Sequence, residues 1–158
     1  MTKKFNTTGP CLQERHYMLP PEQRLSEVRD LIDDQAFFVI HAPRQTGKTT
    51  LLRNLSRKLT QEGRYAAITC SLENFTQPDP ERMLPRILAQ LEYDAQRQLS
   101  KELSPPQHES YAAVPDVALQ HYLSNWSEQL ARPLVIFFDE IDSLPGSVLL
   151  PILRQLRN

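Results

Sequence analysis

The feature that most restricts the fold of this chain is segment 42–49, which reads APRQTGKT. It matches the phosphate-binding pattern GxxxxGK[ST] at every fixed position except the first, where Ala42 replaces glycine. A phosphate chain needs backbone N–H groups that converge from a tight loop at the N-terminus of a helix. The unsatisfied donors and the helix dipole both favour an anion there. The segment therefore predicts a strand, a phosphate loop and a helix, in that order.

The flanking segments have the patterns that such a loop requires. Residues 37–42 read FFVIHA, an apolar run without polar alternation, which predicts a strand covered on both faces. The helix after the loop is expected to end near Gly63, a residue suited to a C-terminal cap. One side of this helix carries four leucines, Leu51, Leu52, Leu55 and Leu59. The alternative is that Gly-Lys-Thr-Thr simply begins a helix. That alternative does not explain the apolar run before the segment or the leucine stripe after it.

Three loop residues have specific expected roles. Gly47 lets phosphate approach the backbone without a Cβ in the way. Lys48 is expected to reach the β- and γ-phosphates, and Thr49 to place its hydroxyl on Mg²⁺. For Arg44 the choice stays open between a phosphate, a neighbouring subunit and solvent. The full predicted nucleotide-binding set is Pro43, Arg44, Gln45, Thr46, Gly47, Lys48, Thr49 and Thr50.

A pair of carboxylates follows the second long apolar run, LVIFF at 134–138. In open α/β sheets ligands collect at the carboxyl ends of strands, and adjacent carboxylates there are costly unless a cation or a water needs them. Asp139 is therefore predicted to hold Mg²⁺. Glu140 is predicted to orient or deprotonate the attacking water, so that Glu140 and Lys48 form the catalytic set. The alternative is an ordinary acidic strand-to-loop junction, and Asp142 reads as a turn residue or cap.

Apolar periodicity outlines the other elements. It predicts a surface helix at 22–34, strands at 65–72 and 134–138, and helices around 84–95, 119–130 and 147–156. Pro85 and Pro151 are expected in first turns, and Ser147 is expected to cap the last helix. The order from residue 37 onward is then β-α-β-α-α-β-α, which argues for an α/β fold with a mainly parallel sheet. Residues 1–21 are interpreted as an irregular N-terminal arm and residues 22–158 as the core.

Composition excludes several other classes. Eighteen basic and nineteen acidic residues give a net charge of -1, which supplies no general attraction to nucleic acid or to an anionic membrane. No apolar run is long enough to span a bilayer and no secretory leader is evident, so a cytoplasmic location is expected. Cys11 and Cys70 belong to no CxxC or Cys/His cluster, and His108 and His121 lack metal-ligand spacing. Nothing in the sequence supports a zinc site.

Together, APRQTGKTT and LVIFFDEID resemble the Walker A and Walker B motifs of P-loop ATPases, and specifically the AAA-like ATPases of bacteria. The leading FNTTGP and HYMLPP are similar to the N-terminal part of the same family. The resemblance implies a three-layer α/β/α P-loop NTPase fold that binds and hydrolyses Mg-ATP. Lys48, Thr49, Asp139 and Glu140 would carry the family's roles. His16, Tyr17 and Met18 would lie where the family's arm approaches the adenine, with simple packing of the arm as the alternative.

The resemblance also implies elements that this sequence lacks. In this class of ATPase a strand with a polar sensor residue follows the Walker B strand and lies between it and the phosphate-loop strand. The arginine finger and the small helical lid lie further on as well. Arg154 and Arg157 are interpreted as basic residues that complement the dipole of the last helix. The expectation is a core that is incomplete at its C-terminus, with impaired turnover.

Three functions are consistent with these features. The leading one is a Mg-ATP-binding ATPase module that couples nucleotide binding and hydrolysis to conformational change or assembly, with a homo-oligomer or a partner protein left open. The second is a non-catalytic, nucleotide-gated signalling or interaction module. The third is the ATPase of a DNA-handling assembly, because DEIDSL resembles origin-recognition initiators and transposition ATPases, although the net charge does not support it. The preference for ATP over GTP rests on the resemblance.

Overall fold

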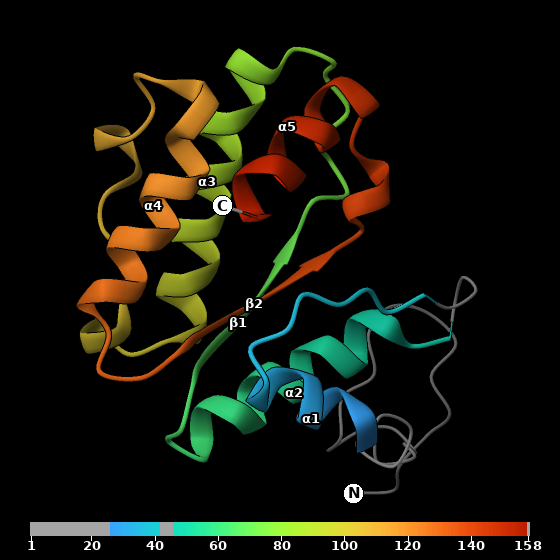
Figure 1. Ribbon diagram of the computed structural model, residues 1–158, viewed down its shortest axis with the longest axis vertical. Helices are drawn as coiled ribbons and strands as arrows, with labels where there is room; N and C mark the ends of the chain where they lie inside the picture. Colours follow the sequence, from blue (N-terminus) through green and yellow to red (C-terminus); the bar gives the residue numbers. More distant parts are fainter. Residues whose placement is uncertain (1–25, 42–45, 158) are drawn as a thin grey trace, which may run out of the picture.

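The computed structural model describes residues 26–41 and 46–157, so the predicted arm at 1–21 lies outside the described residues. Two parallel strands, β1 (Ala66–Ser71) and β2 (Leu134–Asp139), form the sheet, with Ala66 opposite Leu134 and Ser71 opposite Asp139. One face carries α1 (Ser26–Asp33) and α2 (Lys48–Gln61). The other face carries α3 (Pro80–Gln98), α4 (Pro115–Gln129) and α5 (Gly146–Arg157). Figure 1 shows these three layers, an α/β/α arrangement with an incomplete sheet, as predicted.

Short 3₁₀ turns complete the described chain. They are η2 (Lys101–Leu103) and η3 (His108–Ser110) between α3 and α4, and η4 (Ile141–Ser143) directly after β2. No helix among the described residues has the length and apolar character that crossing a membrane requires.

The two strands send alternate side chains to two separate apolar clusters. Ile68 and Cys70 are fully buried in the cluster under α3, α4 and α5. Ala67 and Phe137 point the other way and pack with Leu59 of α2. Because both faces of each strand are covered, neither strand shows the polar alternation of a half-exposed sheet. This is why two of the apolar runs in the sequence identified their strands correctly.

The outer edge of β1, which faces away from β2, is closed by side chains from both helical layers. The Thr60 hydroxyl of α2 accepts from the Ala67 N–H (2.9 Å) and donates to the Ala67 carbonyl (3.1 Å). The Gln98 amide of α3 accepts from the Thr69 N–H (2.9 Å) and donates to the Thr69 carbonyl (2.8 Å). On the same strand, the Thr69 hydroxyl lies 3.1 Å from the Ser56 hydroxyl of α2. These bonds fix the position of α2, and so of its N-terminus, relative to the sheet.

The C-terminal end of α2 follows the predicted pattern. Glu62 is the cap, and Gly63 follows it with a φ of 78°, in the left-handed region that favours glycine.

We therefore expect Gly63→Ala to lower the free energy of unfolding by about 1 to 2 kcal/mol. The cost is conformational, since a Cβ at this position would meet only Arg132 Nη1 at 4.0 Å. Urea denaturation measures it. Gly146→Ala is the matched control, because Gly146 begins α5 outside the left-handed region and a Cβ there meets nothing within 4 Å. Equal destabilisation by the two substitutions would contradict this account of the α2 end.

Both prolines expected in first turns lie inside their helices instead. Asp79 caps α3 by accepting from the Glu81 N–H (3.1 Å), so the helix begins at Pro80 and Pro85 falls in its interior. Helix α5 begins at Gly146, which places Pro151 in its interior as well. Ser147 is therefore not the cap, and its hydroxyl donates to the Pro78 carbonyl (2.6 Å). In both helices the burial of an apolar stripe outweighs the backbone bond that proline removes.

The prediction of a strand at 37–42 is wrong for residues 37–41, and Ala42 lies outside the described residues. Phe38 and Ile40 pack against the cluster around α1 and α2, and the Phe38 ring meets Phe137 edge-on with centroids 6.5 Å apart. Phe37 and Val39 are 77% and 86% exposed. Within the described parts of the chain no strand lies between this segment and β2, so its backbone has no ladder partner. An apolar run signals burial, but it does not supply the neighbour that turns a segment into a strand.

Candidate nucleotide-binding site

A glycine in the left-handed backbone region, which residues with a side chain rarely adopt, precedes α2. Gly47 is the N-cap, with φ 86° and ψ 21°, and its carbonyl accepts from the Leu51 N–H (2.9 Å) to start the helix. A Cβ would meet nothing within 4 Å there, so the torsion angle and not a lack of space favours glycine. Lys48 and Thr49 are the first residues of the helix and are half-buried. An anion at this point gains from the helix dipole.

The remaining predicted loop residues divide between described and undescribed parts of the chain. Thr46 is exposed directly before Gly47, and Thr50 is half-buried in the first turn of α2. Four positions lie outside the described residues: Ala42, Pro43, Arg44 and Gln45. The same holds for the residues expected near the adenine, His16, Tyr17 and Met18, and for Cys11.

Asp139 ends β2 and is only 5% exposed. Its backbone carbonyl accepts from the Leu72 N–H (2.9 Å). Carboxylate oxygens are donors that divalent cations prefer, and ligands collect at the carboxyl ends of strands in α/β sheets. The position therefore has the chemistry of a metal ligand.

Glu140, the next residue, leaves the strand through a left-handed turn. Its φ of 59° is uncommon for a residue with a side chain, and its side chain is exposed. Its carbonyl accepts from the Ser143 N–H (3.0 Å), which closes η4. The Ser143 hydroxyl donates to the Leu72 carbonyl (2.7 Å), so the turn is tied to the end of β1. Asp142 is an exposed residue within η4, in agreement with its interpretation as a turn residue.

The structure brings the start of α2 and the end of β2 to one side of the sheet. Both strands of Figure 1 point toward the side from which α2 enters the fold. Contacts of Leu52 and Leu59 of α2 with the cluster that includes Phe137 hold the helix against the strand. A glycine-led helix N-terminus and a buried carboxylate at a strand end can together hold an anion and its counter-cation.

Several residues outside the phosphate loop and the end of β2 also have clear places in the fold. Trp126, in the helix predicted around 119–130, is a fully buried core residue, and its Nε1–H donates to the Leu103 carbonyl (3.0 Å). Arg154 and Arg157 lie in the last turn of α5, where they complement the helix dipole. His41, which the predicted strand at 37–42 would place in the sheet, is exposed and belongs to no strand.

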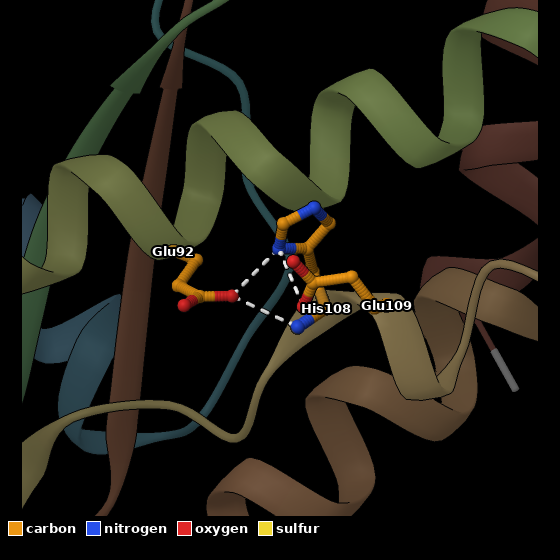
Figure 2. Close-up of side chains that lie close together, drawn as sticks. All are labelled: Glu92, His108 and Glu109. Carbon is orange, nitrogen blue, oxygen red and sulfur yellow. Dashed lines mark hydrogen bonds and ion pairs between the residues drawn. The ribbon is translucent and has the colours of Figure 1, made fainter.

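One group of potential metal ligands has no counterpart among the residues that the sequence pattern singled out. His108 of η3 lies against Glu92 of α3, with Nδ1 2.7 Å from Oε2, and Glu109 lies beside them (Figure 2). The spacing of these residues in the sequence did not predict the cluster. Its members come from α3 and η3, which are joined by a link that includes η2.

The family model described as AAA domain matches residues 28–158, which is most of the chain. The matched region includes the N-terminus of α2 and the end of β2. No curated protein and no solved structure matches the chain. The family match agrees with the α/β fold and with the resemblance of the two sequence motifs. This chain therefore belongs to the AAA-like P-loop ATPase domain family.

Proposed function

We propose that this chain binds Mg-ATP where α2 begins and β2 ends, and that it couples nucleotide binding and hydrolysis to a change of conformation or assembly. The observation that carries the proposal is the left-handed Gly47 directly before a helix that starts with Lys48 and Thr49. This is the geometry in which backbone N–H groups and a helix dipole face a phosphate. Membership of the family supports a nucleotide as the ligand.

In this proposal the phosphates are bound by the loop and the first turn of α2. Lys48 interacts with the β- and γ-phosphates through its ammonium group. Gly47 allows the phosphate to approach the backbone closely, and Thr46 and Thr50 continue the cradle on either side. Pro43, Arg44 and Gln45 complete the set on the strength of the sequence pattern alone.

The residues that would hold Mg²⁺ are Thr49 and Asp139. Both offer oxygen atoms, the donors that this ion prefers, and it keeps several waters of its own. The fit is supported by the burial of Asp139 at the end of β2. When bound, the ion neutralises charge on the phosphate oxygens.

Glu140 is the proposed base for the attacking water. Its exposed side chain follows a buried strand end, and its left-handed backbone directs the chain away from β2 within a single residue. The carboxylate orients the water and accepts its proton, while Asp139 stays with the cation.

We expect Glu140→Gln to leave Mg-ATP binding unchanged and to slow phosphate release by about 100-fold or more, because the amide cannot accept the proton. Isothermal titration calorimetry measures binding, and a phosphate-release assay measures turnover in the same samples. Glu128→Gln is the matched control, since Glu128 is an exposed residue of α4. Parallel loss of binding and turnover in Glu140→Gln would refute the role given to Glu140.

The same experiment separates the proposed ATPase from a nucleotide-gated interaction module. Turnover by the wild-type chain that depends on Glu140 supports the ATPase. Tight binding without any turnover, together with a nucleotide-dependent change in molecular mass by light scattering, would favour the gated module.

A further inference from the structure

A cluster of three potential metal ligands lies outside the proposed nucleotide site. Glu92 comes from α3, and His108 and Glu109 come from η3 (Figure 2). The His108 Nδ1 lies 2.7 Å from Glu92 Oε2 and 3.4 Å from Glu109 Oε2. One ligand atom from each residue falls within 4.8 Å of the others. Three donors therefore converge on a space of a few ångströms.

The Glu92 carboxylate is held in place by two neighbours. Oε2 accepts from the His108 backbone N–H (2.8 Å) as well as lying beside the imidazole. Oε1 accepts from the Gln96 side-chain amide (3.0 Å), one turn further along α3. Metal-binding carboxylates and imidazoles are oriented by such outer hydrogen bonds, which preserve the geometry of the site. Glu92 is thus held close to a ligand position before any ion arrives.

We propose that Glu92, His108 and Glu109 bind a divalent transition-metal ion, with zinc as the best fit. Imidazole nitrogen and carboxylate oxygen are zinc donors, and two carboxylates balance the charge of a dication. Two ligands of a tetrahedral zinc stand about 3.4 Å apart. The distance from His108 Nδ1 to Glu109 Oε2 is 3.4 Å. Glu92 Oε2 lies 2.7 Å from His108 Nδ1. It would have to move away from that nitrogen by about 0.7 Å to reach the separation of two zinc ligands.

A buried hydroxyl close to the cluster provides an independent observation. Tyr122 of α4 is fully buried, and its hydroxyl has no hydrogen-bond partner among the described residues. Burial raises the pKa of Tyr122, and the negative charge of Glu92 is the next largest cause, with Glu109 contributing as well. Three protein ligands leave the fourth zinc position to a water. Tyr122 is thus an unsatisfied buried donor beside the residue that follows η3, and a metal-bound water is a group that could accept from it.

The consequence of metal binding would be local order in the link between α3 and α4. The link is attached by its η3 turn to Glu92 and by the Leu103 carbonyl to Trp126. The Tyr111 ring, directly after η3, meets the Tyr122 ring edge-on at 5.4 Å. An ion that joins η3 to α3 would hold this aromatic contact closed without touching the nucleotide site.

The test is a zinc titration of the chelator-treated full chain against a chromogenic competitor, with Co²⁺ absorption as a second readout. We expect His108→Ala to weaken zinc binding at least tenfold and to remove the visible bands of bound Co²⁺. His121→Ala, an exposed histidine on α4, should change neither. Because Glu109 is 73% exposed, Glu109→Gln should fold normally and still weaken zinc binding.

Two results would overturn the proposal. One is a wild-type chain that binds no zinc. The other is equal zinc affinity in the wild type and Glu109→Gln, which would place any bound ion elsewhere in the chain. The variant of Glu109 keeps the test decisive even when His108→Ala fails to fold.

Discussion

Replacing Trp126 with alanine should lower the free energy of unfolding by about 3 to 5 kcal/mol. The indole is fully buried, and its ring centroid lies 6.2 Å from that of Tyr122. Its N–H donates to the Leu103 carbonyl (3.0 Å). Alanine leaves a cavity between α4 and the α3–α4 link and removes the donor of a buried carbonyl. Urea denaturation followed by far-UV circular dichroism measures the change.

Trp126→Phe separates the two contributions. It keeps most of the buried volume but loses the hydrogen bond, so the expected loss is smaller, about 1 to 3 kcal/mol. A Trp126→Ala variant that loses less than about 1 kcal/mol would contradict the position of the indole in the core.

The second large effect is expected at the start of α2. Lys48→Ala should weaken Mg-ATP binding by about two orders of magnitude, because it removes a positive charge from the phosphates at a helix N-terminus. Lys48 is half-buried as the first residue of the helix, so its loss should leave the fold intact. Calorimetric titration with Mg-ATP gives the affinity, and the unfolding midpoint without nucleotide shows that the variant is folded.

Lys101→Ala is the matched control for loss of charge, since Lys101 is exposed at the start of η2. It should bind Mg-ATP as the wild type does. Equal affinity of Lys48→Ala and Lys101→Ala would exclude Lys48 from the phosphate site. Lys48→Arg should recover part of the affinity, because it restores the charge without restoring the geometry of the ammonium group.

The sequence predicted those elements whose pattern depends on local contacts and full burial. The strands β1 and β2 follow from apolar runs that are buried on both faces, and α2 follows from its leucine stripe and from Gly63. The segment at 37–41 shares two phenylalanines, a valine and an isoleucine with β2 but lacks a neighbouring strand among the described residues. Strand formation depends on a partner that is distant in the chain, and composition does not report it.

In the candidate site, too, features set by local sequence were predictable and features set by tertiary contacts were not. The glycine at position 47 was expected from the phosphate-loop pattern, but its left-handed backbone is a finding of the structure. The burial of Asp139 followed from its place at the end of an apolar strand. The left-handed turn at Glu140 was not predictable, since its cause lies in the way η4 is tied to the end of β1. The contact of His108 with Glu92 also depends on tertiary structure, because a turn of irregular shape joins the two elements.

The closure of the outer edge of β1 by Thr60 and Gln98 affects how the molecule behaves in concentrated solution. An open strand edge offers its N–H and C=O groups to strands of other molecules, which is a common route to aggregation. At Ala67 and Thr69 these groups are already bonded to side chains of α2 and α3. An incoming strand would have to break four hydrogen bonds before forming its own. The β1 edge is therefore protected against pairing with strands of other molecules at these two residues.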